Sequence, residues 1–309
     1  MKRFIVQTGI FFAILLTGYV LLSWFVNANR VPPNDYLAAM ELKHQRLKNT
    51  PSPRIIIAGG SNVTFGIDSE LLETELNLPV VNLGIHAGLG LDFMLEELES
   101  VTRPGDIVLL IPEYFLHVQG EYELQTLASS LYPPASEFYE EDLITDLKAH
   151  FSNNRKNLRN ILNRVPPDTN TIYRKKSFNS RGDMVAHLDL PDKETLTAEA
   201  VINYKYWEGI DRMNHLSAKL DKRNATLIFM FPVLAESKFN KSREEISALK
   251  RDLENDLNAK ILGEPQDFMF KDSYFYNTVY HPNAAGRQLR TEKMILLLKN
   301  SELLSTIQR

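Results

Sequence analysis

Ser61 follows two glycines at the end of an apolar run, in the segment Gly59-Gly60-Ser61-Asn62. A serine between a strand end and the first turn of a helix presents its hydroxyl at the carboxyl edge of a sheet, beside the free N–H groups of that helix. It could attack an acyl carbon once a base has removed its proton. Two alternatives are that Ser61 only caps the helix or that the loop binds phosphate, although no lysine follows the glycines.

His281 is the candidate base. It stands in a loop, in the segment Tyr280-His281-Pro282-Asn283, just before a helix predicted over residues 284–299. A neutral imidazole there could take the proton of Ser61 and return it to a leaving group. Its other ring nitrogen would need an orienting partner. The alternative is a structural histidine in a turn.

A second glycine turn, Asn82-Leu83-Gly84-Ile85-His86, follows the next apolar run. We expect the N–H groups of Gly84 and Ser61 to stabilise a developing oxyanion together. His86 is expected to support the site or to face solvent. An ordinary turn between strand and helix is the alternative reading of these glycines.

Short β-branched runs predict the strands that must position these residues, at 54–60, 79–84, 106–112, 225–232 and 259–262. Helices are expected at 36–47, 68–76, 89–100, 198–222, 242–257 and 284–299. Strands that alternate with helices predict a three-layer α/β sandwich around a parallel sheet. Because ligands bind at the carboxyl ends of such strands, the candidate residues should meet at one edge.

The N-terminal segment from Phe4 to Val26 is apolar and uncharged, long enough to cross a bilayer. Lys2 and Arg3 precede it, which predicts a single-pass protein with a cytoplasmic N-terminus and an extracytoplasmic remainder, periplasmic or extracellular. A cleaved signal peptide is the alternative. We therefore expect an anchor over 1–30, a proline-containing stalk over 31–53 and an α/β domain over 54–309, with a mainly helical insertion at about 120–195.

Composition narrows the function further. The net charge is −4 and the isoelectric point about 6.0, which disfavours nucleic-acid binding. The absence of cysteine excludes disulfides and thiolate sites. Between Lys148 and Arg181, nine cationic residues face one acid, Asp168. That stretch is either a solvated spacer or a contact surface for anionic glycan or lipid headgroups.

These segments resemble the three blocks of the SGNH (GDSL-type) hydrolase superfamily, which implies a flavodoxin-like parallel sheet. Gly59-Gly60-Ser61 matches the first block with Gly60 in place of an aspartate, and Gly84 matches the glycine of the second. His281 matches the catalytic histidine, but Thr278 stands where the family has its aspartate. Asn277 is then the best orienter for His281, and Asp272 is a further candidate.

The third block departs most from the family. Strand three ends in Ile111-Pro112-Glu113-Tyr114, without the asparagine that the family uses as an oxyanion donor. Glu113 and Tyr114 are therefore expected to bind substrate or to support the site, and so is Asn62.

The resemblance looks strongest to a membrane-anchored branch similar to proteins that O-acetylate exported polysaccharides. It implies ester hydrolysis or acyl transfer on a surface carbohydrate, without metal or cofactor, alongside polysaccharide-export or acyl-transfer proteins. Because an asparagine does not stabilise imidazolium as a carboxylate does, we expect a slow hydrolase or a transferase. The alternatives are a degenerate domain that binds glycan or a partner protein without catalysis, and a structural membrane protein.

Overall fold

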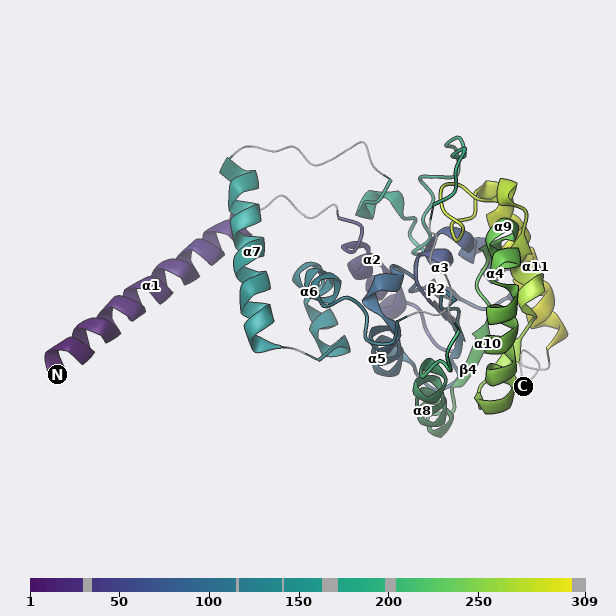
Figure 1. Ribbon diagram of the computed structural model, residues 1–309, viewed down its shortest axis with the longest axis horizontal. Helices are drawn as coiled ribbons and strands as arrows, with labels where there is room; N and C mark the ends of the chain where they lie inside the picture. The colour runs from purple at the N-terminus through teal and green to yellow at the C-terminus, as the bar shows by residue number, and fades with distance from the viewer. Residues whose placement is uncertain (30–34, 115–116, 141, 163–171, 198–203, 302–309) are drawn as a thin grey trace. The chain divides into compact units, whose positions relative to one another are not determined.

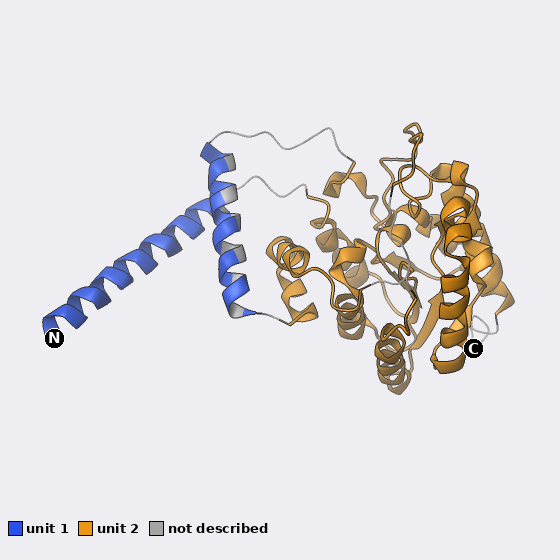
Figure 2. Cartoon of the chain, viewed as in Figure 1, with its two compact units in different colours: residues 1–34, 141–171 blue, residues 35–140, 172–309 orange. Residues whose placement is uncertain are grey.

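The computed structural model describes residues 1–29, 35–114, 117–140, 142–162, 172–197 and 204–301. The chain divides into two compact units, coloured separately in Figure 2. Residues 35–140 and 172–309 form what we call the α/β unit, and residues 1–34 and 141–171 form the anchor unit. Each unit is described by itself.

The α/β unit is built on a parallel sheet with the strand order β2-β1-β3-β4-β6. This is the flavodoxin-like order: β2 lies on one side of β1, and the later strands, beginning with β3, are added on the other side. The five strands are those predicted from the β-branched runs: β1 Ile55–Ala58, β2 Val80–Asn82, β3 Ile107–Leu110, β4 Thr226–Met230 and β6 Lys260–Leu262.

Helices cover both faces of this sheet. Every residue of β1 and β3 is buried, although successive side chains of a strand point to opposite faces. The helix α5 packs beside α8, and α11 packs against α3 and α4 (Figure 1). The three-layer α/β prediction is confirmed, with α3 Ser61–Gly66, α4 Ser69–Leu76, α5 Leu91–Val101, α8 Gly209–Lys222, α10 Arg243–Asp256 and α11 Ala284–Asn300.

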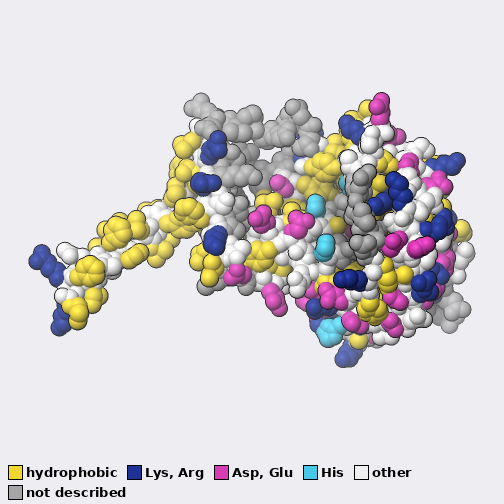
Figure 3. Space-filling model, in the orientation of Figure 1, with side chains coloured by type: hydrophobic (Ala, Val, Ile, Leu, Met, Phe, Trp, Pro, Cys, Tyr) yellow, Lys and Arg dark blue, Asp and Glu magenta, His cyan; other side chains and the backbone are white. Residues whose placement is uncertain are grey.

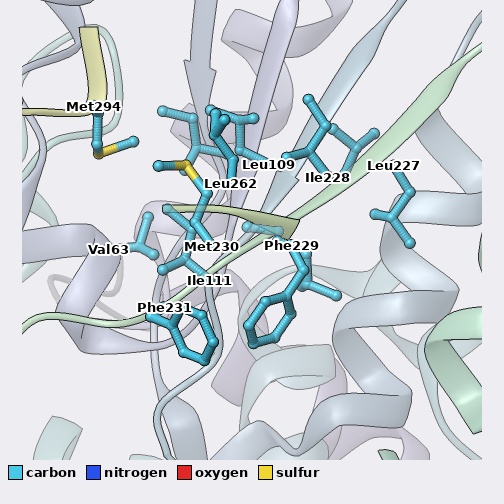
Figure 4. Packing of buried hydrophobic residues seen from close by; sticks show 14 of the residues in the cluster. Val63, Leu109, Ile111, Leu227, Ile228, Phe229, Met230, Phe231, Leu262 and Met294 are labelled. Carbon is cyan, nitrogen blue, oxygen red and sulfur yellow. The ribbon is translucent and has the colours of Figure 1, made fainter. Parts of the chain in front are cut away.

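The main core joins the ends of the strands to the helices that carry the candidate residues. Val63, from α3, lies close to Ile111, the residue after β3, and to Met230, the last residue of β4 (Figure 4). Helix boundaries follow local capping. The Asp68 side chain accepts from Leu71 N at 3.1 Å to begin α4, and the Asn283 side chain accepts from Gly286 N at 3.0 Å to begin α11. These caps fix the loops next to the candidate site.

The predicted stalk is different in the structure. Within it, α2 (Ala39–Asn49) buries Met40 and Leu47 against the α/β unit. The buried Lys43 ammonium donates to Asn82 O at 3.0 Å. Residues 35–53 therefore belong to the α/β unit and are not a spacer, because their apolar side chains complete its core. Residues 30–34 lie outside the described residues.

The predicted insertion is divided between the two units. In the α/β unit, α6 (Tyr122–Leu131) follows β3, and residues 172–197 return to the sheet edge. Asp183 fastens the returning segment, because its carboxylate accepts from Ser69 Oγ at 2.6 Å and from Asn82 Nδ2 at 2.9 Å, and Arg287 lies 3.3 Å from it. Only α7 (Leu143–Leu162) belongs to the anchor unit.

Several smaller elements were not predicted. The described helix in the 198–222 region is α8, which begins at Gly209, while residues 198–203 lie outside the described residues. A two-stranded sheet and a short helix follow β4 and β6. They comprise β5 Leu234–Ala235, β7 Met269–Phe270 and α9 Glu236–Lys241, with single 3₁₀ turns at Ala87–Leu89, Pro133–Phe138, Lys175–Ser177, Pro265–Phe268 and Asp272–Tyr274.

The anchor unit contains α1 (Lys2–Asn29) and α7. Residues Lys2–Val26 of α1 have a mean hydropathy of 2.1 over the most apolar window, long and apolar enough for a membrane span or a signal sequence. Hydrophobic side chains are exposed along the length of α1 (Figure 3). The predicted apolar helix is therefore present, and its orientation in a membrane stays a prediction.

The central position of β3 leads to a test of the fold. Leu109→Ala removes a fully buried side chain from β3 and should lower the free energy of unfolding of the α/β unit by about 2–5 kcal/mol. The matched control, Leu296→Ala on the exposed side of α11, should change it by less than about 0.5 kcal/mol. Urea denaturation of the full chain in detergent measures both, and equal effects would contradict the assigned core.

Candidate active site

Ser61 is the first residue of α3, directly after the turn that leaves β1. The turn needs glycine because other backbone lies against it. A Cβ on Gly59 would collide with Ile111 O, and a Cβ on Gly60 would collide with the Glu113 carboxylate and lie 2.7 Å from Ala87 N. Ser61 itself is partly exposed between buried neighbours. The predicted strand, glycine turn, serine and helix are therefore present, at the carboxyl end of β1.

A buried polar network holds this turn. The Glu113 carboxylate accepts from Gly60 N at 3.1 Å and from Asn62 N at 3.0 Å. The Asn62 amide donates to Ile111 O at 3.1 Å and accepts from Arg290 Nη2 at 2.8 Å. Arg290 Nη1 also donates to Asn62 O. Ser61 lies between two residues whose backbone is fixed on both sides, so its position is set by β3 and α11 as well as by α3.

His281 lies against the same helix. Its ring stacks on that of Phe65, with centroids 4.0 Å apart and planes 2° from parallel. Phe65 comes four residues after Ser61, so the two side chains share one face of α3. A Cβ on Gly66 would lie 3.1 Å from Pro282, which again places the histidine loop on α3. The histidine loop therefore packs on the helix that begins with Ser61, although no hydrogen bond joins Ser61 Oγ to the ring of His281.

Asn277 holds His281 in one orientation. Its Oδ1 lies 2.9 Å from His281 Nδ1, and its Nδ2 donates to the Tyr173 hydroxyl at 2.8 Å. With the amide nitrogen committed to Tyr173, Oδ1 accepts the Nδ1–H of a neutral imidazole, and Nε2 keeps its lone pair. The predicted contact between Asn277 and His281 is present, whereas Tyr173 was not predicted. It comes from a segment distant in sequence and carries no local signal.

A second histidine, His187, holds the loop that carries His281. His187 Nε2 donates to Pro282 O at 3.0 Å, and its ring lies 4.7 Å from that of Phe65. His187 is buried, as is His281. Sequence reasoning missed it because a lone histidine in an irregular segment has no recognisable pattern. Its role is to fix the backbone that carries His281.

Burial controls the charge of both histidines. Removal from water lowers the pKa of His281 to about 3, with further lowering from the neighbouring His187 and His86. Burial likewise lowers the pKa of His187 to about 4, although its bond to Pro282 O opposes this. Both rings are therefore neutral at physiological pH. A neutral His281 can accept a proton, but burial makes its protonated form unfavourable.

The oxyanion prediction needs one correction. Gly84 N already donates to Asn82 Oδ1 at 3.0 Å. A Cβ at Gly84 would collide with Val63, so this glycine is required for close packing. Ala87 N lies beside Gly60 instead. Among the described residues, the N–H groups of Ser61 and Ala87 take part in no hydrogen bond that would compete with a ligand. Ser61 and Ala87 are therefore the better pair of donors.

Thr278 and Asp272 do not contact the ring of His281. Thr278 Oγ1 accepts from Tyr280 N at 3.2 Å and so closes the turn that presents the histidine. Asp272 Oδ1 accepts from Ser237 N at 3.0 Å, at the start of α9. Since Asn277 occupies Nδ1 of His281, the alternative that Asp272 orients this ring is wrong.

The remaining predicted residues fill supporting positions. His86 Nδ1 accepts from Gly88 N at 3.0 Å and begins the turn that carries Ala87. The side chain of Asn62 is fully buried and bonded at both ends, so it is not available to a substrate. Tyr114 packs in the main core near Phe231, and burial raises the pKa of its hydroxyl. Glu113 holds the β1–α3 turn, so these four residues support the framework of the site.

Among the described residues, no group of three or more histidine, aspartate or glutamate side chains is placed to hold a metal ion. The site is instead a serine, a neutral histidine with an amide partner, and two backbone donors. This arrangement suits proton transfer coupled to attack by a hydroxyl.

Comparison with known proteins gives structural neighbours only. Neither models of protein families nor curated proteins match this sequence. A G-D-S-L family lipolytic protein from Desulfitobacterium hafniense DCB-2 is 12% identical with a TM-score of 0.37, over 79% of this chain and 98% of that one. The solved structure of a platelet activating factor from Streptococcus pneumonia is 13% identical with a TM-score of 0.38, over 91% of this chain and 97% of that one.

A third neighbour is a family two carbohydrate esterase from Clostridium thermocellum, in complex with cellohexaose. It is 13% identical with a TM-score of 0.32, over 81% of this chain and 65% of that one. Similarity at this level assigns no activity.

The low pKa of His187 predicts how stability depends on pH. As pH falls below 6.5, the unfolded histidine takes up a proton while the folded one, with a pKa of about 4, does not. Folding stability is then lost between pH 6.5 and 4, by roughly 2 kcal/mol on reaching pH 5. His187→Gln keeps an N–H donor for Pro282 O. Its folding stability should therefore fall less than that of the wild type when the pH is lowered to 5. Urea denaturation at pH 7 and 5 measures it, and an unchanged pH dependence would contradict a buried neutral His187.

The contact with Tyr173 predicts a positioning role. Tyr173→Phe removes the acceptor of Asn277 Nδ2, so the amide can rotate and His281 can adopt the wrong tautomer. Loss of one hydrogen bond of about 1 kcal/mol should slow the reaction of Ser61 with a fluorophosphonate about fivefold. Tyr139→Phe, which loses a hydroxyl contact with Ser129 away from the site, is the control. ¹⁵N NMR of His281 should show the mixed tautomer only in Tyr173→Phe; a single tautomer in both variants would refute the role.

Proposed function

We propose that the protein is a serine esterase or O-acyltransferase that acts through Ser61 and His281. The observation that carries the proposal is the stacking of His281 on Phe65, on the helix face that Ser61 shares, with Asn277 on the other ring nitrogen. A structural turn histidine needs neither contact. Both contacts support the proposed roles of Ser61 as nucleophile, His281 as base and Asn277 as orienter.

The reaction is a double displacement. Ser61 Oγ bonds to the ester carbon while its proton passes to His281 Nε2. The N–H groups of Ser61 and Ala87 stabilise the oxyanion. The carbon–oxygen bond to the leaving group then breaks, and the leaving alkoxide takes the proton from His281. An acceptor hydroxyl, from water or from a sugar, attacks the acyl-enzyme by the same steps in reverse.

A slow hydrolase or a transferase suits this site better than a fast hydrolase. Asn277 orients His281 but carries no negative charge to balance imidazolium, and burial already disfavours that form. A bound sugar hydroxyl, held in place by the site, gains more from proximity than a mobile water does.

The substrate class proposed is an ester on a carbohydrate outside the cytoplasm. The apolar helix α1, which begins with Lys2 and Arg3, supports a single membrane span with the α/β unit on the outer side. Exported polymers pass at that surface. Polysaccharide-export or acyl-transfer proteins are then natural partners and donors of the acyl group.

A second function has its own support. The carboxylate that orients the histidine in the superfamily is replaced by Thr278, whose hydroxyl closes a backbone turn. A domain that lost catalysis would bind a glycan or a partner protein at the membrane.

Probe labelling separates the two functions. The full chain in detergent is treated with a fluorophosphonate, and the adduct is located by mass spectrometry. An adduct on Ser61, lost in Ser61→Ala and at least about 100-fold slower in His281→Ala, is expected for the enzyme. Because the pKa of His281 is about 3, the wild-type rate should stay level from pH 8 down to about 5. No adduct in folded protein would favour the binding module.

The variant Asn277→Asp sharpens this test. A carboxylate beside His281 raises the pKa of the imidazole. Labelling of Asn277→Asp should therefore begin to fall at a higher pH than in the wild type. Coincident pH profiles would show that the titration of His281 does not govern the reaction.

A further inference from the structure

Helix α7 of the anchor unit exposes large apolar side chains. Ile144 is 64% exposed, and Leu147 and Phe151 are each 61% exposed. Their spacing of three and four residues places them along one side of the helix. Leu162, at 71%, continues this stripe in the last turn. An isolated exposed leucine needs no explanation, but a stripe along a helix indicates a surface that something covers.

A strip of cations runs beside the apolar stripe. Lys148, Arg155 and Arg159 are exposed, and their spacing of seven and four residues aligns them on one side. Asn154 lies on the other flank of the apolar stripe and faces α1. The helix therefore has three adjoining strips: one against α1, one apolar and one basic. Apolar and basic strips side by side are typical of helices that lie in a membrane interface.

The contact with α1 fixes the depth of α7. Asn154 Nδ2 donates to Ser23 Oγ at 2.8 Å and to Tyr19 OH at 3.2 Å. The Phe151 ring stacks on Tyr19, with centroids 5.9 Å apart and planes 20° from parallel. Phe151 therefore lies at the level of Tyr19 along α1, and whatever surrounds α1 at that level also reaches Phe151.

That level is the far edge of the apolar span. The span covers Lys2–Val26, and about 20 residues of helix cross a hydrocarbon core. Tyr19 and Ser23 then fall near its last turns. Trp24, 69% exposed, follows directly, and tyrosine and tryptophan are the residues that favour the headgroup region. A polar hydrogen bond between Asn154 and Ser23 also suits the interface better than the hydrocarbon centre.

We propose that α7 is a second membrane-binding element, which lies in the headgroup region of the leaflet distant from Met1. Ile144, Leu147 and Phe151 enter the acyl boundary beside α1, and Lys148, Arg155 and Arg159 bind anionic lipid phosphates. This inference rests on the membrane anchor proposed above and is independent of the ester chemistry. It assigns the basic stretch of the insertion to lipid, in the part that α7 covers.

Single cysteines can test the depth cleanly, because the chain has none of its own. Leu147→Cys places an environment-sensitive fluorophore on the apolar stripe. Ser152→Cys, exposed and about 140° away around the helix, is the matched control. Each full-length variant is reconstituted into phosphatidylcholine vesicles with and without phosphatidylglycerol. Quenching by nitroxide-labelled lipid is compared with quenching by aqueous iodide, and fluorophosphonate labelling of Ser61 is recorded on the same samples.

The expected result is lipid quenching and iodide protection at position 147 and the reverse at position 152, strongest with phosphatidylglycerol. Replacing Lys148, Arg155 and Arg159 by glutamine should lower the ratio of surface-bound to free α7 by about 100-fold, since each surface cation contributes roughly fivefold.

Three outcomes would overturn the proposal. Equal iodide quenching at both positions would show that α7 is off the bilayer. Protection of position 147 from both quenchers would show that protein, such as a second copy, covers the stripe. Protein that does not float with vesicles at all would reject the anchor itself, whatever the labelling of Ser61 reports.

Discussion

The candidate site depends on the hydrogen bonds that the buried guanidinium of Arg290 donates to Asn62. It binds the backbone oxygen and the side-chain oxygen of Asn62, directly after Ser61. Burial lowers the pKa of Arg290 to about 9, and the nearby Glu113 partly offsets this effect, so the group stays charged at neutral pH. A buried charge is tolerated only with such partners, and removal of one partner typically costs about 3–5 kcal/mol. The turn before Ser61 therefore cannot relax without breaking contacts to β3 and α11.

The histidine loop is constrained by a different principle, which is burial of rings. His281 lies between the ring of Phe65 and the Asn277 amide, while His187 fixes the next carbonyl. Stacking and hydrogen bonding determine where the ring lies and which nitrogen is free. The same burial removes the water that would stabilise imidazolium. The position and the basicity of His281 are therefore coupled, because the packing that holds its ring in place also lowers its pKa.

The sheet and the segments that carry Ser61 and His281 could be predicted from the sequence because their signals are local. β-branched runs mark strands, and residues after strand ends must meet at one edge, which brought Ser61, His281 and Asn277 into one hypothesis. Tyr173, His187 and Arg290 could not be found this way, since each acts through a fold contact with a distant segment. Gly84 was assigned to the wrong task because a glycine needed for packing against Val63 looks the same in sequence as one that frees an N–H. In the stalk a helix was expected at residues 36–47, but its packing into the core was missed because the contacts of α2 are with distant segments.

Glu113 explains why a buried arginine is needed at all. Its carboxylate takes the N–H groups on either side of Ser61, so the start of α3 offers a new anion only the N–H of Ser61 and, from the adjoining turn, that of Ala87. A fixed negative charge there would oppose an oxyanion at Ser61. Arg290, across Asn62, supplies the balancing positive charge without reaching the reacting atoms. The turn is thus rigid and close to neutral in charge, which permits acyl chemistry but adds little electrostatic stabilisation. For the proposed acyl chemistry, such a site would rely on the positioning of its substrates, and this would favour an acceptor that binds over one that diffuses.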